Sequence, residues 1–527
     1  MGSIRDFQFK KHWIALPLLS GFLLLLSFYP FELQFLSFIA LVPIFLFLNA
    51  KDEIPGKKIF WGGFIFGAFF SLILSLFIFF KFIWLEETYL FVWIVRLLPL
   101  FIAAITGTIF GFSFLAYKRF SSGKPTDIFV LAAIYTLAEI VQFKIFFGLN
   151  SGLLAYTVYK FLFFLKFSSI TGVFGISFII ALINSFIAYF VLRPEHRKQV
   201  ASLALASFAV IFTINAANNL YLKNDEDYKT AKFSIIQNSD RKNVFGNIID
   251  GKFHLPYQGL ISEAKYQNPD FIIYPFSPFN GYLSSIKIDE IQNSGLKKEA
   301  VIDSENFDKW IGKLTGTDTF FINWVNVIKD EKVYPEMIFW QNGKQIAEYQ
   351  KRITFPFFDY TPEFFKKIGL FTTPIDALQS LKNNLPIQIN DIKFEPLICS
   401  ELFESKLIRK GSLNSNILLS IGSDASFSNE VPDKWHLTIL QFEAAGNNRP
   451  IVKANLFGSS VLIDENGKII KEMKFNKTGV LTGELQYKKS PKNTFYGYFG
   501  DLPFIIAIVL FLTVYMASEK FNYRREK

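Results

Sequence analysis

Cys399 is the residue whose type and position are best suited to chemistry, and it is the only cysteine among 527 residues. It lies within Phe394–Phe403, where the short apolar run Phe394–Ile398 predicts a strand and Ser400–Lys410 has helix-forming composition. A thiol at that junction lies near a helix N-terminus, where the backbone dipole favours the thiolate. A reactive nucleophile and a buried structural cysteine are the two interpretations of such a residue.

The composition indicates that part of the chain lies in a lipid bilayer. Hydrophobic residues make up 51% of the sequence, aromatic residues make up 18%, and 65 residues are Phe. Residues 1–218 carry long, nearly uncharged apolar runs, whereas residues 219–500 have mixed composition. We therefore expect a transmembrane domain of seven helices at 1–218, a linker at 219–231, an external domain at 232–490, and a last helix with a cytoplasmic tail at 491–527.

The apolar runs predict eight spans: Trp13–Phe28, Leu33–Leu48, Ile59–Ile83, Tyr89–Tyr117, Ile128–Phe143, Ser168–Leu192, Ala201–Ile214 and Leu502–Met516. Every second connection is basic, beginning with Arg5, Lys10 and Lys11, although the connection 144–167 also carries three lysines. The positive-inside rule then places both termini in the cytoplasm and the large domain outside. Cys399 would lie in an oxidising compartment without a disulfide partner in the chain, which favours the nucleophile.

Other features of the sequence limit the function. The net charge of +10 arises largely from basic clusters beside spans, so we expect membrane topology and no nucleic-acid binding. The four His residues lack zinc-site spacing, and neither a metal nor a cofactor is expected. Glu139 lies inside an apolar run and predicts a buried partner or a cavity. Gly62, Gly63 and Gly67 indicate close helix packing, and His436 is interpreted as a packed or surface histidine and not as a base.

The segment after residue 232 has the pattern of a layered α/β domain. Turns at Gln341–Gly343 and Asp464–Gly467 predict hairpins, and helices are expected at Leu255–Tyr266 and Asp433–Asn447. The expected strands are Phe233–Gln237, Phe271–Tyr274, Thr319–Val325, Met337–Trp340, Ile346–Tyr349, Phe394–Ile398, Ile417–Ile421, Ile451–Asn455, Ser459–Ile463 and Lys468–Met473.

Several motifs, in order, resemble the apolipoprotein N-acyltransferase family. Tyr349–Pro362 is similar to the family's tyrosine, lysine and "LVPFGEYVP" segment, and Leu397–Glu401 is similar to its "ICYE" nucleophile segment. Ser20–Phe22 through Ala40–Pro43 resembles its first two spans. The resemblance implies a bacterial inner-membrane protein with eight transmembrane α-helices and a periplasmic α/β domain, a nitrilase-like αββα sandwich of the carbon-nitrogen hydrolase superfamily.

The resemblance also implies a reaction and its residues. A phospholipid would donate an acyl chain, a cysteine thioester would hold it, and the N-terminal amine of a diacylglyceryl apolipoprotein would accept it; we expect the chain to act as a monomer. Cys399 takes the nucleophile position and Lys351 the position of the family's lysine. Glu401 and Asp359 fall where the family has supporting carboxylates.

The family's catalytic glutamate position is occupied by Phe276, in the segment Phe271–Phe276. A phenyl ring cannot accept a proton, and general base catalysis contributes about 10² to 10⁴-fold. One hypothesis is that Glu401, or secondly Glu336, substitutes for the glutamate. Another is a catalytically impaired or inactive paralogue that retains lipid or lipoprotein binding. A third, a nitrilase-class hydrolase of a small amide, fits the eight spans less well.

Overall fold

The computed structural model divides the chain into two compact units. Unit 1 comprises residues 1–82, 93–224 and 499–527, and unit 2 comprises residues 83–92 and 225–498. The structure describes residues 13–50, 54–79, 89–146, 148–149, 151–223, 227–240, 247–249, 252–254, 258–275, 282–284, 301–329, 332–354, 367, 386–427 and 429–525.

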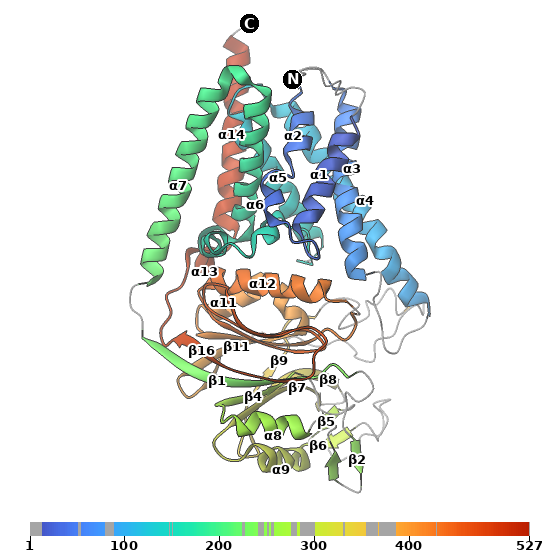
Figure 1. The fold of residues 1–527 in the computed structure, drawn as a ribbon, viewed down its shortest axis with the longest axis vertical. Helices are drawn as coiled ribbons and strands as arrows, with labels where there is room; N and C mark the ends of the chain where they lie inside the picture. The colour runs from blue at the N-terminus through green and yellow to red at the C-terminus, as the bar shows by residue number, and fades with distance from the viewer. Residues whose placement is uncertain are drawn as a thin grey trace. The chain divides into compact units, whose positions relative to one another are not determined.

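Unit 1 is built from apolar helices (Figure 1). The helices are α1 (Ala15–Ser27), η2 (Gln34–Phe38), α2 (Val42–Leu48), α3 (Gly56–Phe79), α4 (Tyr89–Phe120), α5 (Asp127–Ile145), η3 (Leu154–Val158), α6 (Leu162–Leu192), η4 (Pro194–His196), α7 (Arg197–Lys223) and α14 (Leu502–Arg525). Among the described residues, six of these helices (α3–α7 and α14) are long and apolar enough to cross a membrane. The first two expected spans form the shorter apolar helices Ala15–Ser27 and Gln34–Leu48, so the count of eight spans stays a prediction.

Small residues allow α3 and α4 to pack closely, as the glycines in the sequence predicted. A Cβ atom on Gly63 would lie 2.6 Å from the carbonyl oxygen of Phe110 and 2.9 Å from the Cα of Gly111. Only glycine fits such an approach between two backbones. Glu139 of α5 is fully buried, and its Oε1 accepts a 2.7 Å hydrogen bond from the N–H of Leu154 in η3. The predicted buried partners of this carboxyl therefore include a backbone group.

Unit 2 contains two large sheets. Its strands are β1 (Tyr228–Gln237), β2 (Asn247–Ile249), β3 (Lys252–His254), β4 (Phe271–Tyr274), β5 (Tyr282–Ser284), β6 (Val301–Asp303), β7 (Phe320–Lys329), β8 (Lys332–Gln341), β9 (Lys344–Gln350), β10 (Ile387–Ile389), β11 (Ile392–Ile398), β12 (Ile417–Ser423), β13 (Ile451–Leu456), β14 (Ser460–Ile463), β15 (Ile469–Met473) and β16 (Gly479–Lys488). One sheet has the order β16-β1-β4-β7-β5-β6, with β8 and β9 continuing from β7; the other has the order β10-β11-β12-β13-β14-β15. Both predicted hairpins are confirmed, as β8–β9 and β14–β15.

The two sheets face each other between layers of helices (Figure 1). Phe233, Phe271 and Phe339 from the first sheet share a buried core with Phe394 and Leu419 from the second. On the other face of the first sheet, α8 (Gln258–Tyr266) and α9 (Ser304–Thr315) complete a second core. Helices α11 (Ser405–Ser412) and α12 (Val431–Asn447) accompany the second sheet, and α13 (Phe495–Phe499) follows it in the chain.

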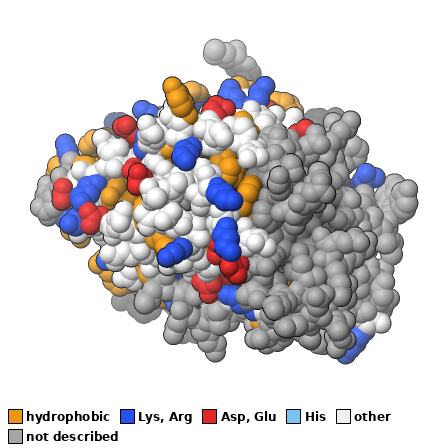
Figure 2. All heavy atoms as spheres, turned by 90° about the horizontal axis from the view of Figure 1, so that it is seen from below, with side chains coloured by type: hydrophobic (Ala, Val, Ile, Leu, Met, Phe, Trp, Pro, Cys, Tyr) orange, Lys and Arg blue, Asp and Glu red, His pale blue; other side chains and the backbone are white. Residues whose placement is uncertain are grey.

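Charged side chains of both signs are interspersed over the described part of the face drawn in Figure 2. Lys and Arg residues lie next to Asp and Glu residues there, and small groups of apolar side chains lie between them. A mixed surface of this kind is typical of a solvated face of a domain.

Candidate active site

Cys399 lies at the corner between β11 and the 3₁₀ helix η7 (Cys399–Phe403). Its φ of 52° is left-handed, a conformation that costs a residue with a side chain about 1–2 kcal/mol. The side chain is half-buried and packs against the core between the sheets. On neighbouring β12, a Cβ atom on Gly422 would lie 3.6 Å from the Cα of Cys399. The predicted strand-to-helix corner is confirmed, and its strained backbone is typical of functional positions.

Lys351 directly follows β9 and is buried at 1% exposure. Tyr349, two residues earlier, belongs to the core between the sheets. Because side chains alternate along a strand, Lys351 continues on the face of Tyr349, toward the core against which Cys399 packs. Its N–H donates a 3.0 Å hydrogen bond to the carbonyl of Pro335 on β8. Lys351 follows a strand of the first sheet and Cys399 follows a strand of the second, so the two residues that the resemblance assigned to chemistry both face the core between the sheets.

Glu401 is fully buried and connects the two segments. Its Oε1 accepts hydrogen bonds from the N–H groups of Arg352 at 2.7 Å and Ile353 at 3.1 Å. Its Oε2 accepts bonds from the Tyr349 hydroxyl at 2.9 Å and the N–H of Ile398 at 2.8 Å. Burial raises the pKa of Glu401, and these donors together with the charge of Lys351 oppose the rise. Four donors thus hold a carboxylate that fixes the backbone on both sides of the site.

Glu336, the other proposed substitute base, lies on the opposite face of the first sheet. It pairs with Val325 on β7 and with Gln350 on β9, and Val325 belongs to the core beneath α8 and α9. Its Oε1 lies 2.9 Å from the Nζ of Lys329, and burial raises the pKa of Glu336. The structure therefore brings Glu401, but not Glu336, together with Lys351 and Cys399.

Two further predicted site positions, Phe276 and Asp359, lie outside the described residues. Phe276 follows the described end of β4 at Tyr274 by two residues. Within the described residues, no group of three or more His, Cys, Asp or Glu side chains is placed to hold a metal ion.

A buried charge network that the sequence did not predict adjoins Glu401. The Arg352 guanidinium pairs with the buried Glu395 of β11, and its Nε donates a 2.9 Å hydrogen bond to the Tyr349 hydroxyl. Burial raises the pKa of Glu395 to about 7, against the attraction of Arg352. A Cβ atom on Gly411 of α11 would lie 1.9 Å from the Glu395 carboxyl carbon, so only glycine fits there. The sequence signal for this network is Glu395 within the otherwise apolar run Phe394–Ile398.

A second buried cluster lies where β12 and β13 end beside α12. His436 Nδ1 is 3.1 Å from Asp424 Oδ1, and Lys453 Nζ is 3.1 Å from Asp433 Oδ1. Burial alone would raise the pKa of Asp424, but attraction to His436 and Lys453 lowers it to about 2. The His436 ring packs 5.2 Å from that of Phe403 in η7. Of the two alternatives for His436, a packed or a surface histidine, the structure shows the packed one, and its cluster supports the segment that carries Cys399.

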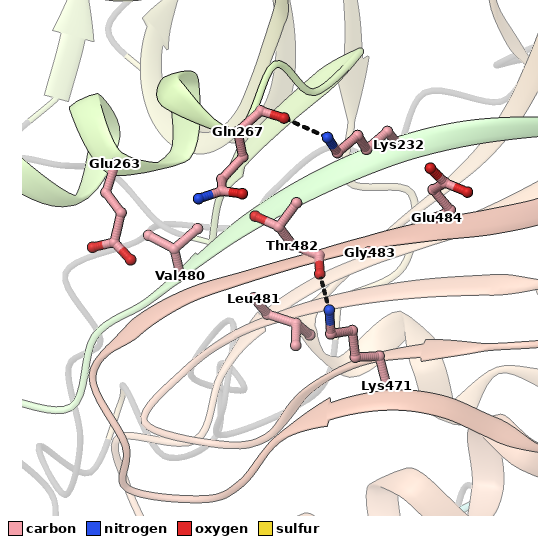
Figure 3. A pocket seen from close by; sticks show the side chains of 9 residues that line it. All are labelled: Lys232, Glu263, Gln267, Lys471, Val480, Leu481, Thr482, Gly483 and Glu484. Atoms are coloured by element: carbon pink, nitrogen blue, oxygen red, sulfur yellow. Dashed lines mark hydrogen bonds between the residues drawn. The ribbon is translucent and has the colours of Figure 1, made fainter.

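A polar hollow of about 600 Å³ lies elsewhere on unit 2, at the edge formed by β16 (Figure 3). Glu263 and Gln267 from α8, Lys232 from β1 and Lys471 from β15 line it. Lys232 and Lys471 donate hydrogen bonds to the carbonyls of Gln267 and Thr482. The amino groups of both lysines are bonded to backbone carbonyls, and the Thr482 hydroxyl is bonded to that of Ser234, so the corner at Cys399 remains the candidate site.

Known proteins match this chain in both units. The family profile for the apolipoprotein N-acyltransferase N-terminal domain matches residues 20–186, and the carbon-nitrogen hydrolase profile matches residues 299–490. An apolipoprotein N-acyltransferase of Borreliella burgdorferi is 25% identical over 98% of this chain and 97% of its own length. Apolipoprotein N-acyltransferase 1 of Treponema denticola is 24% identical over 93% of each chain, and the Haemophilus ducreyi enzyme is 25% identical over 74% of each.

Among solved structures, a CN-hydrolase superfamily protein from Xanthomonas campestris aligns with 49% of this chain and 90% of its own, at 17% identity and a TM-score of 0.34. Apolar helices joined to a carbon-nitrogen hydrolase domain define a multi-pass membrane relative of the carbon-nitrogen hydrolases. Together with the relatives that match nearly its whole length, they establish that the chain belongs to the apolipoprotein N-acyltransferase family.

Proposed function

We propose that this chain is an apolipoprotein N-acyltransferase that uses Cys399 as its nucleophile. The thiolate attacks an ester carbonyl of a phospholipid, the ester C–O bond breaks, and the lysophospholipid alcohol leaves with the thiol proton. The amine at the N-terminus of a diacylglyceryl lipoprotein then attacks the thioester. The C–S bond breaks, an amide forms, and the thiol recovers a proton from the amine.

The placement of Cys399 carries this proposal. A strained corner presents the thiol beside β12 of the second sheet, and the buried Lys351 follows β9 of the first sheet on the side that faces the same core. We assign Lys351 to stabilising the oxyanion of each tetrahedral intermediate, because a positive charge in a water-poor site favours developing negative charge. Glu401 positions the two segments. Asp359, in the segment that follows, remains a proposed supporting carboxylate.

The proposed setting is the bacterial inner membrane, with both termini in the cytoplasm and unit 2 in the periplasm. The apolar helices of unit 1 and the basic connections of the sequence support it. A substrate that is itself a membrane lipid explains why a hydrolase-type domain carries so many apolar helices. We propose a chain that acts as a monomer through eight spans, with α1 and η2–α2 as the two short ones.

Mass spectrometry of the purified full-length chain tests the proposal. After incubation with a phospholipid, we expect one acyl group on the peptide that contains Cys399, and its removal by hydroxylamine because the link is a thioester. Cys399→Ala is expected to abolish the adduct, whereas Glu484→Gln, at an exposed position on β16, is expected to retain it. If the folded wild-type chain forms no acyl adduct at any pH, the proposal that this chain is an acyltransferase is refuted.

A further inference from the structure

An apolar groove runs between α6 and α7 in unit 1. Its volume is about 430 Å³, which lies in the range of ligand sites. Its lining includes Phe164, Ile179 and Ile183 from α6, and Leu205, Ala209 and Phe212 from α7. Both helices are long and apolar enough to cross a membrane. The groove therefore lies in the part of the molecule for which lipid is the solvent.

The shape of the groove follows from a break in α6 and from one small residue in α7. Gly172 has φ 64° and ψ −166°, so the helix is interrupted between Phe164 and Ile179. On α7, Phe208 and Phe212 reach across to α6, where their rings lie 6.3 Å from Phe186 and 6.4 Å from Phe163 respectively. Ala209 lies next to Phe208 and lacks a side chain long enough to bridge the helices. The two aromatic contacts thus hold the helices apart and leave the groove open.

The groove opens toward lipid, because α7 packs against α6 along one side only. Leu205 is 75% exposed and Phe212 is 66% exposed, although both line the groove. Water in this groove would form almost no hydrogen bonds with the apolar lining, so water is a poor occupant. An empty groove would lack the dispersion contacts that a bound group provides. A flexible hydrocarbon chain satisfies both conditions.

Polar groups mark one end of the groove, at the end of α7 that leads to β1. Asn215, one turn beyond Phe212, lies 3.5 Å from the Phe163 carbonyl through its Nδ2. Asn218 donates a 2.8 Å hydrogen bond to the hydroxyl of Ser169. Asn215 is buried and both amide groups are bonded within the protein, so these residues mark a polar end of the apolar groove, the end at which the ester and phosphate groups of a lipid would lie. We propose that this groove binds one acyl chain of a bilayer phospholipid, with the headgroup at the asparagine end.

Photocrosslinking in vesicles tests the site with a phosphatidylcholine that carries a diazirine in one acyl chain. We expect labelling of the peptides that contain residues 205–212 and 163–183, saturating at one lipid per chain and competed by unlabelled phosphatidylcholine. Ala209→Trp, which fills the groove, is expected to reduce this labelling at least fivefold. Ala206→Trp is the matched control because Ala206 is exposed and does not line the groove.

Equal labelling of the two tryptophan variants, or labelling that does not saturate, would overturn the proposal, since both outcomes describe ordinary boundary lipid. Ala209→Leu replaces Ala209→Trp if the larger variant does not purify as a folded chain, and the same reduction is expected. Cys399→Ala is expected to keep the groove labelling while losing the acyl adduct. Failure of the catalytic proposal and failure of the lipid site are therefore distinguishable.

Discussion

Arg352 shows how single residues determine the electrostatics of this site. Its guanidinium pairs with Glu395 and with the Tyr349 hydroxyl, while its N–H is bonded to Glu401. Two buried carboxyls and one guanidinium thus share a small volume beside Cys399. Buried charges lose their hydration, which raises the pKa of each carboxyl, whereas pairing with Arg352 lowers it.

Glu395 provides a pH-dependent prediction. Burial raises its pKa from 4.5 to about 7, against the attraction of Arg352. The folded chain then holds this proton more tightly than the unfolded chain, so the associated stability is present below pH 4.5 and is lost as pH rises through 7. Glu395→Gln cannot lose a proton, and we expect its melting temperature relative to wild type to rise across this window. Thermal unfolding in detergent at several pH values measures it.

The same measurements on Glu484→Gln, on the exposed side of β16, are expected to show no such trend. A difference between Glu395→Gln and wild type that is constant from pH 4.5 to 7 would contradict the raised pKa.

At the scale of elements, the site depends on strand ends that are distant in sequence. Glu401 in η7 joins the segment after β9 to the end of β11, and it does so through three backbone N–H groups and one hydroxyl. The parallel strands β11 and β12 place Cys399 next to Gly422. A shift of either segment would move the thiol relative to Lys351.

Glu401→Gln tests this positioning role. The carboxylate accepts hydrogen bonds through two oxygens, whereas the glutamine amide has one oxygen and one NH₂ group. The NH₂ group would face two of the present donors, and each donor left unpaired costs roughly 1–3 kcal/mol. We expect a loss of about 2–6 kcal/mol in unfolding free energy. Tyr349→Phe removes one donor to Glu401 and the acceptor of the Arg352 Nε, and it is expected to cost about 2–4 kcal/mol. Chemical denaturation measures both changes.

The pH profile of acyl-adduct formation separates positioning from base catalysis. A positioning Glu401 predicts that Glu401→Gln forms the adduct more slowly with an unchanged profile. Disappearance of one ionisation from the profile would instead identify Glu401 as the proton acceptor.

At the scale of the whole molecule, the chain leaves unit 1 after α7, forms unit 2, and returns to unit 1 as α14. The Tyr515 hydroxyl on α14 donates a 2.5 Å hydrogen bond to Asp127, and its oxygen lies 2.7 Å from the Ser122 hydroxyl. The nearby pair of Lys124 and Glu519, at 2.7 Å, is partly exposed and is expected to contribute little. Polar contacts near the start of α5 thus help to hold the last helix in its unit.

The proposed topology is testable with single cysteines, because Cys399 is the only native one. In a Cys399→Ala background, Glu484→Cys on unit 2 is expected to react in intact spheroplasts with a membrane-impermeant maleimide. Arg119→Cys, also exposed but in a basic connection, is expected to react only after the membrane is permeabilised. Labelling of both residues, or of Arg119→Cys alone, in intact spheroplasts would contradict the orientation.

Local patterns determined much of the fold. All ten expected strands overlap strands of the structure, because alternation and turn residues act over a few neighbours. Strand β16 was missed: it contains two glycines, and its pairing with β1 joins residues about 250 positions apart in the sequence. The expected linker 219–231 includes the end of α7 at Lys223 and the start of β1 at Tyr228, since a helix boundary depends on packing as well as composition.

The sequence by itself determined the apolar character of residues 1–218, the strand-to-helix corner at Cys399 and the family motifs around it, because these depend on composition and short-range order. Only the tertiary structure decided which carboxylates accompany the thiol. In the structure, Glu336 lies on the other face of the first sheet, Glu401 accepts hydrogen bonds from four donors, and Glu395 pairs with Arg352. Strand register and sheet packing made those choices, and both depend on contacts between segments far apart in the chain.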